Sequence, residues 1–297
     1  MKKGQAPREI SYAYSAETRA GRAVIRSIEN LTGRLSLIRR ALGYEHEVSA
    51  GRDFWEVMTE RYGVKLDAGP NGLEGIPSEG PLVVVANHPF GILDGMAMGR
   101  MLSARRGDFK IIAHKVFHKA KELERIILPI NFDDNREAQK INLATRKEAL
   151  AYLADGGAIG IFPGGTVSTS KRPFGHPMDP AWRLFTAKLV TRSDAQVVPI
   201  FFHGANSRFF QLISHVHPTL RTALFIKEFG RGIREPLKAT IGAPLPGDEI
   251  QARAKDAAAL MDYLRDQTYL LSPNPLPSLD YGYEFESQHL GRERRAA

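Results

Sequence analysis

A histidine and an aspartate, His88 and Asp94, lie six positions apart in the segment 87–95 of this 297-residue chain. Imidazole titrates near neutral pH, and a carboxylate beside one ring nitrogen fixes the tautomer and stabilises the charge formed when the other nitrogen takes a proton. The pair therefore has the chemistry of a general base and its orienting partner. The chain has no Gly-x-Ser-x-Gly elbow, so the reacting hydroxyl would have to come from a substrate. A satisfied structural histidine is the alternative reading of the pair taken alone.

A second segment, Phe162–Ser168, is rich in glycine. Backbone amides around Gly164, Gly165 and Thr166 can approach and hold a phosphate or an oxyanion, because glycine has no side chain to keep a ligand away. Lys171 and Arg172 follow this segment and could pair with the phosphate of a donor. A tight turn followed by a solvated loop is the alternative.

Both segments directly follow short apolar runs that are typical of buried strands. These runs are 82–86, 109–113, 126–130, 158–162 and 197–202, and helical patterns lie between them at 137–154 and 180–192. Strands that alternate with helices predict an α/β fold with a largely parallel mixed sheet flanked by helices. Ligands bind such sheets beyond the carboxyl ends of the strands. His88 can meet Asp94 there if a helix begins near Asp94.

The amino-terminal part of the chain is basic and amphipathic. Residues 1–42 contain nine Lys/Arg and three Glu, which accounts for +6 of the formal net charge of +8. We expect residues 16–42 to be helical, with a break near 30–33, and a second helix from Ser49 to Tyr62. One apolar stripe of the first helix follows steps of four and three: Val24, Ile28, Leu31, Leu35, Ile38 and Leu42. The helix either packs on the domain or docks on an anionic membrane surface.

Several classes of protein are excluded by composition. Because the chain has no cysteine, disulfides, Cys-ligated zinc and thiolate nucleophiles are ruled out. No apolar segment is long enough for a transmembrane helix, and no apolar run follows the first residues as in a signal peptide. His114 and His118 have the spacing of metal ligands on a helix, but no third ligand is evident and we expect no metal.

The two chemical segments together resemble the glycerolipid acyltransferase superfamily, typified by 1-acylglycerol-3-phosphate acyltransferases. That superfamily has Asn-His-x-x-x-x-Asp after a buried strand and Phe-Pro-Glu-Gly-Thr-x-Ser after a later one. The corresponding blocks here are 87–94 and 162–168, and Val197–Ile200 resembles the family's late strand. The Asn-His-Pro-Phe-Gly form of the first block is similar to a haemolysin-like branch that includes ornithine-lipid O-acyltransferases.

The resemblance implies that His88 deprotonates a lysolipid hydroxyl, which attacks an acyl thioester, and that Asp94 orients His88. The residues expected to bind substrate lie in and after the two blocks: Asn87, Gly91, Pro163, Gly164, Gly165, Thr166, Lys171 and Arg172. The donor would be an acyl carrier protein or coenzyme A thioester, used as a co-substrate without any cofactor. The acceptor would be a lysolipid in membrane lipid biosynthesis.

Three departures from the family pattern bear on the acceptor. Five residues separate His88 from Asp94 where the family has four, and Gly91 can absorb the insertion. Gly164 replaces the usual Glu, and the segment 128–133 lacks the Arg that often meets glycerol phosphate. These changes favour a lyso-aminolipid such as lyso-ornithine lipid over lysophosphatidate, which stays the alternative. Asp133 and Asp134 could meet an amine headgroup or cap a helix.

We therefore expect a helical membrane-docking segment at 1–63, an α/β acyltransferase domain at 64–271 and an irregular tail at 272–297. The expected location is cytoplasmic, peripheral on the inner face of the cytoplasmic membrane. Two rivals remain: a hydrolytic relative, and a nucleic-acid-binding protein that uses the basic helix. Because the helix lacks interleaved aromatic residues and any reader motif, we expect no nucleic-acid partner.

Overall fold

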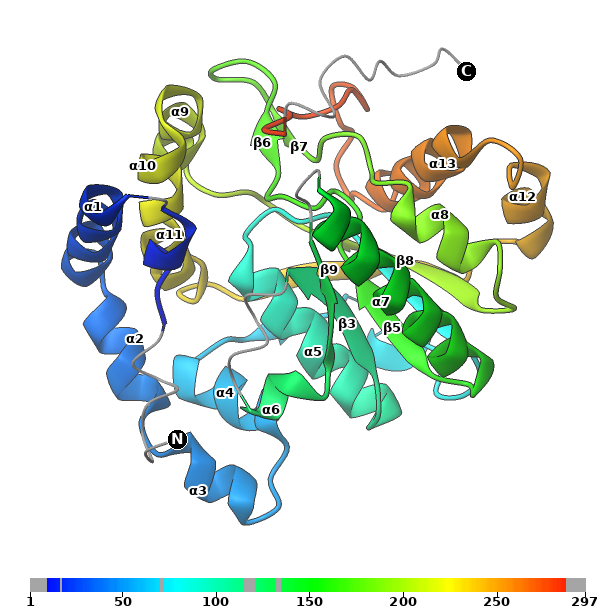
Figure 1. Ribbon diagram of the computed structural model, residues 1–297, viewed down its shortest axis with the longest axis horizontal. Coiled ribbons are helices and arrows are strands. Elements are labelled where there is room, and N and C mark those ends of the chain that lie inside the picture. Colours follow the sequence, from blue (N-terminus) through cyan, green and yellow to red (C-terminus); the bar gives the residue numbers. More distant parts are fainter. Residues whose placement is uncertain (1–9, 17, 70–71, 115–120, 132–134, 287–297) are drawn as a thin grey trace.

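A seven-stranded sheet forms the centre of the protein, in a computed structural model that describes residues 10–16, 18–69, 72–114, 121–131 and 135–286 (Figure 1). The strand order is β1-β9-β8-β2-β5-β3-β4, and all neighbours are parallel except the pair β8 and β9. The strands are β1 (Leu66–Asp67), β2 (Leu82–Ala86), β3 (Lys110–His114), β4 (Ile127–Ile130), β5 (Ala158–Ile161), β8 (Gln196–Phe202) and β9 (Leu237–Ile241). The predicted largely parallel mixed sheet is confirmed.

The central strand β2 shows why the sheet is covered on both faces. All five of its residues are buried. Leu82, Val84 and Ala86 belong to one hydrophobic core, and Val83 and Val85 belong to the other. Because side chains alternate across a strand, an uninterrupted apolar run needs helices on both sides of the sheet.

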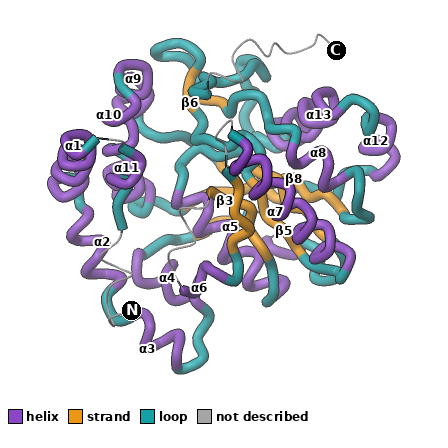
Figure 2. The backbone as a smooth tube through the Cα atoms, in the orientation of Figure 1, coloured by secondary structure: helices purple, strands orange, loops and turns teal. Residues whose placement is uncertain are grey.

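Two sets of helices supply these layers (Figure 2). The face of Val84 packs against α2 (Arg34–Ala41), α4 (Phe54–Tyr62), α5 (Ile92–Arg106) and α11 (Phe225–Gly232). The face of Val83 packs against α7 (Arg136–Ala154), α8 (Phe185–Val190), α12 (Gly247–Ala252) and α13 (Ala257–Tyr269). In Figure 1 the helices α8, α12 and α13 lie together at the right.

Outside these two sets of helices, the described residues form further helices, two 3-10 turns and one hairpin. They are the helices α1 (Arg19–Leu31), α3 (Tyr44–Ser49), α6 (Lys121–Glu124), α9 (Arg208–Val216) and α10 (Pro218–Ala223), the 3-10 turns η2 (Ala13–Ser15) and η3 (Gly72–Gly75), and the hairpin of β6 (Thr169–Ser170) and β7 (Pro177–Met178). In Figure 1 α1, α9, α10 and α11 gather at the left. None of the helices within the described ranges is long and apolar enough to span a membrane.

Of two predictions for the amino-terminal helices, one is confirmed and one is wrong. The expected break near residues 30–33 is present, because Gly33 has φ +123° between α1 and α2. The predicted start of the next helix at Ser49 is wrong: α3 ends there, and α4 begins after Asp53, whose side chain accepts a hydrogen bond from the Glu56 amide. A carboxylate at this position satisfies one of the free amides of the first turn, which makes Asp53 the better cap.

The predicted apolar stripe of α1 and α2 is largely exposed. Ile25, Leu37 and Ala41 pack inward, together with the buried charged residues Glu29 and Arg34. Four residues of the predicted stripe are instead exposed: Val24 (44%), Leu31 (87%), Leu35 (49%) and Leu42 (46%). The stripe is therefore only partly packed: Ile28 contacts the hydrophobic clusters beside α1, and the four exposed residues face away from them.

The division into segments 1–63, 64–271 and 272–297 stays a prediction. Helices α2 and α4 share a core with the sheet, so the helical segment packs closely on the α/β part. In residues 272–286, the described part of the tail, the backbone is irregular and is held by Arg265, which donates to the carbonyls of Leu279 and Asp280.

Candidate active site

His88 and Asp94 are brought together where β2 passes into α5. Nδ1 of His88 lies 3.0 Å from Oδ2 of Asp94. The Asp94 side chain is completely buried, whereas 18% of the His88 side chain is exposed. The structure thus places the two predicted catalytic residues in direct contact, with the imidazole as the accessible member.

The turn between the strand and the helix builds this contact. Gly91 has φ +87°, a conformation that suits glycine, and it precedes the first residue of α5. Asp94 lies in the first turn of that helix, and its Oδ2 accepts hydrogen bonds from the amides of Phe90 (2.8 Å) and Gly91 (3.0 Å). The extra residue between His88 and Asp94 is therefore accommodated by a turn that points the carboxylate back at the imidazole.

Burial determines the electrostatics of the pair. Burial raises the pKa of the Asp94 carboxyl, and the neighbouring His88 and the two backbone N–H groups act in the opposite direction. The contact at Nδ1 leaves Nε2 as the ring nitrogen that can exchange a proton with a substrate. The His88 ring stacks on Phe162, with centroids 4.2 Å apart. This stacking fixes the ring plane beside the glycine-rich segment.

A buried carboxylate, Asp179, links the two segments. Its Oδ1 accepts hydrogen bonds from the backbone amide of His88 (3.2 Å) and from the Ser168 hydroxyl (2.5 Å), and its Oδ2 accepts one from the Trp182 indole (2.9 Å). A Cβ on Gly164 would lie 3.2 Å from this carboxyl. Glycine at 164 thus leaves room for a carboxylate supplied from elsewhere in the chain. Asp179 could not be predicted from the sequence, because no spacing links it to either block.

An apolar cavity of about 380 Å³ opens beside His88. Its wall includes aromatic and aliphatic side chains from the amino-terminal helices and from α5, among them Trp55, Met58, Ile92 and Met96. Tyr14 of η2 and the preceding Tyr12 close the cavity from another side. Gly91, Gly165 and Thr166 also line this cavity. Three of the predicted substrate-binding residues therefore share one space with the imidazole.

The other predicted residues lie in different surroundings. The amide of Asn87 donates to the Phe202 carbonyl (2.9 Å) and accepts from the Phe202 amide (2.7 Å), which ties the end of β2 to the end of β8. Pro163 lines a small cavity of about 110 Å³ that His88 and Gly165 also border. Lys171 and Arg172 are exposed in the loop between β6 and β7, outside the lining of these cavities. Substrate contacts of these residues stay a prediction.

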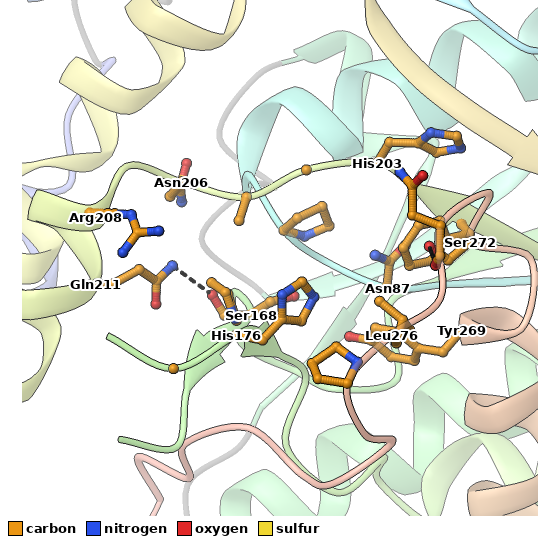
Figure 3. A pocket seen from close by; sticks show the side chains of 18 of the residues that line it. Asn87, Ser168, His176, His203, Asn206, Arg208, Gln211, Tyr269, Ser272 and Leu276 are labelled. Atoms are coloured by element: carbon orange, nitrogen blue, oxygen red, sulfur yellow. Dashed lines mark hydrogen bonds between the residues drawn. The ribbon is translucent and has the colours of Figure 1, made fainter. Parts of the chain in front are cut away.

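A larger, more polar cavity of about 640 Å³ lies on the other side of the His88 segment (Figure 3). Asn87 and Pro89 line it, together with His176, His203 and Asn206, and His88 is not among its lining residues. Figure 3 shows Gln211 bonded to the main chain at Ser168 in this cavity. The imidazole therefore faces the apolar cavity and not this one.

In the described ranges no group of three or more His, Cys, Asp or Glu side chains could hold a metal ion. His118 and the pair Asp133 and Asp134 lie outside the described residues. The expectation of a metal-free and cofactor-free reaction stays a prediction.

Comparison with known proteins identifies the family. The family model described as Acyltransferase matches residues 28–280. The chain belongs to this acyltransferase family. It is similar to the lyso-glycine lipid O-acyltransferases of Phocaeicola vulgatus, with 28% identity over 74% of this chain and 78% of the relative, and of Bacteroides thetaiotaomicron, with 27% identity over 76% and 82%.

The acyltransferase also has a match among solved structures. It resembles the crystal structure of the 1-acyl-sn-glycerophosphate (LPA) acyltransferase PlsC from Thermotoga maritima, with a TM-score of 0.43 and 15% identity over 89% of this chain and 87% of that one. The sequence analysis predicted a member of the glycerolipid acyltransferase superfamily, and this prediction is confirmed.

Proposed function

We propose that this acyltransferase moves a fatty acyl chain from a thioester to the hydroxyl of a lysolipid, with His88 as general base. The observation that carries the proposal is the position of the buried Asp94–His88 pair at the wall of an apolar cavity. Its volume of about 380 Å³ lies within the range of about 300–1,000 Å³ that is usual for ligand pockets. An apolar space beside a general base suits a fatty chain that ends in a reacting group.

In the proposed reaction Nε2 of His88 takes the proton of the acceptor hydroxyl while its oxygen attacks the thioester carbonyl carbon. Asp94 stabilises the imidazolium that forms. The tetrahedral intermediate then collapses, the C–S bond breaks, and the imidazolium returns the proton to the leaving thiolate. In this proposal a backbone amide of the segment 164–166 meets the oxyanion. Thr166 lines the same cavity and supports this role, whereas the amide of Gly165 already donates to the Phe162 carbonyl (3.1 Å).

For the acceptor we favour a lyso-aminolipid, such as lyso-ornithine or lyso-glycine lipid. Two relatives are named lyso-glycine lipid O-acyltransferases, which supports an amino-acid headgroup. Lysophosphatidate is the alternative acceptor. The donor is an acyl carrier protein or coenzyme A thioester.

The test is a transfer assay with purified protein, acyl carrier protein and coenzyme A thioesters, and each class of lysolipid. We expect ester formation on the lyso-aminolipid, and its loss in His88→Ala with an unchanged melting temperature. Thioester cleavage that releases only free fatty acid would identify a hydrolase. Full activity in His88→Ala would refute the mechanism. Lipid mass spectrometry of cells with and without the protein identifies the lysolipid that accumulates.

We also propose that α1 and α2 dock on the inner face of the cytoplasmic membrane. Their exposed apolar residues, Leu31 and Leu35 among them, lie on the same two helices as the exposed basic residues Arg22, Arg39 and Arg40. An interfacial helix combines these two features, because apolar side chains enter the lipid while cations meet anionic headgroups.

Replacement of both leucines tests the docking surface without removing the helices. We expect Leu31→Glu/Leu35→Glu protein to lose sedimentation with vesicles that contain phosphatidylglycerol. The matched control is Leu143→Glu, because Leu143 is also exposed (59%) but lies on α7. Equal sedimentation of the wild type, the double variant and the control would overturn the docking proposal.

A further inference from the structure

Arg221 is a buried cation in the wall of the apolar cavity, and neither motif points to it. It lies on α10, between the aromatic rings of Phe210, Phe225 and Phe285, and 8% of the residue is exposed. It lines the same cavity as His88 and Thr166. A charge in such surroundings is costly unless a partner compensates it.

The partners of Arg221 in the described structure are neutral. One terminal nitrogen donates to the Thr166 hydroxyl (3.3 Å), the Val167 carbonyl (3.2 Å) and the Thr169 hydroxyl (3.5 Å). Its Nε is buried without a hydrogen-bond partner. No carboxylate of the described residues lies within ion-pair distance of its guanidinium. The charge is thus held in place but not neutralised.

A second buried arginine shows the contrast. Arg183 forms ion pairs with Glu284 (2.7 Å) and Glu286 (3.5 Å). Burial lowers the pKa of Arg221 to about 10, so the side chain still carries its charge at neutral pH. A guanidinium with a free N–H group is suited to bind the two oxygens of a carboxylate or phosphate.

We propose that Arg221 binds the anionic headgroup of the lysolipid acceptor. This inference rests on the proposed function and adds the group that selects its acceptor. The group that binds would be an anion with two oxygens. In an amino-acid lipid acylated on nitrogen this anion is the carboxylate, and in lysophosphatidate it is the phosphate. Because Arg221 also bonds Thr166, the anion is held beside the segment that meets the reacting carbonyl.

The experiment compares acceptors that differ only in charge. The probes are N-(3-hydroxypalmitoyl)glycine, its uncharged primary amide, and lysophosphatidate, each assayed with wild type, Arg221→Gln and Arg221→Lys protein. A charged hydrogen bond in a buried site changes affinity by about 10- to 100-fold. We expect the wild type to have a KM about 10- to 100-fold lower for the acid than for the amide.

Arg221→Gln should raise the KM for the acid to about that of the amide, with a much smaller change in the KM for the amide. Arg221→Lys should restore part of the preference. Arg192→Gln, which removes an exposed arginine, is the matched control and should retain the full preference. If the loss is confined to lysophosphatidate, the bound anion is the phosphate. An equal loss with charged and uncharged acceptors, or a change confined to the KM of the donor, would overturn the proposal.

A binding measurement separates this inference from the proposed function. Titration calorimetry of the acid and the amide with His88→Ala protein needs no turnover. Tighter binding of the acid that depends on Arg221 would support the anion site even if the wild type transferred no acyl chain. Active wild type without any discrimination by charge would leave the proposed function intact and refute the site.

Discussion

Replacement of Asp94 by asparagine tests the central contact with the smallest possible change in shape. Asparagine can still accept the amide hydrogen bonds of Phe90 and Gly91, but it has no negative charge to face the imidazolium. Two unit charges 3.0 Å apart interact by about 5.5 kcal/mol at an effective dielectric constant of about 20. Because the asparagine dipole retains part of this interaction, we expect kcat to fall by about 10³- to 10⁴-fold.

Stability should change in the other direction. Burial raises the pKa of Asp94 above its ordinary value of 3.8. As the pH rises, this carboxyl therefore loses its proton in the unfolded chain before it does so in the folded protein. The folded state therefore loses stability between the ordinary and the raised pKa, and above both it carries the full cost of the buried charge. Asp94→Asn should accordingly unfold at the same temperature as the wild type or at a higher one at neutral pH.

The assay pairs initial rates of acyl transfer with thermal unfolding followed by circular dichroism. Asp53→Asn is the control, because it replaces an aspartate that caps α4 far from the imidazole in sequence and should leave kcat unchanged. A kcat for Asp94→Asn within about tenfold of the wild type would refute the reasoning. A large fall in melting temperature would show instead that the carboxylate supports the fold.

Three further changes test the supports of the site. Gly91→Ala introduces a side chain at φ +87° with its Cβ 3.3 Å from Val167, so it should lower both activity and stability. The control is Gly107→Ala, which has φ +71° and no atom within 4 Å of the added Cβ. It should lower the free energy of unfolding by about 1–2 kcal/mol and leave activity unchanged. Asn87→Ala removes two buried hydrogen bonds and should lower the free energy of unfolding by about 2–4 kcal/mol, whereas a higher KM at unchanged melting temperature would show that the side chain binds substrate. Asp179→Ala leaves the Trp182 indole and the Ser168 hydroxyl without their acceptor and should unfold at a clearly lower temperature; an unchanged melting temperature would contradict its bridging role.

The sequence was sufficient to predict five of the seven strands of the sheet, because the burial of these strands follows a local pattern. The run 82–86 has no polar residue, so helices had to cover both of its faces, and the chemical residues after it had to lie at the carboxyl edge. The strands β1 and β9 were not predicted. The strand β9 alternates buried and exposed residues, and its antiparallel position beside β8 depends on packing that no local signal encodes.

The same limit explains what was found and what was missed in the site. His88 and Asp94 are close in sequence, and a single turn brings them together. Asp179 and Arg221 reach the site from elements 91 and 133 positions beyond His88, through buried contacts made only after folding. Their contacts include main-chain groups, hydroxyls and aromatic side chains from several separate segments, and no single spacing in the sequence indicates them.

Glu29 on α1 connects the amino-terminal helices to the wall of the apolar cavity beside His88. Its buried carboxylate accepts hydrogen bonds from the Tyr12 amide (2.6 Å) and the Ser11 hydroxyl (2.5 Å), and Tyr12 forms part of the cavity wall. Deletion of α1 would remove the support of Tyr12 in the cavity wall together with any membrane-binding surface of this helix. A loss of activity in such a protein would not show which of the two was responsible. Surface substitutions, which spare this tether, are therefore the way to separate where the enzyme sits from what it does.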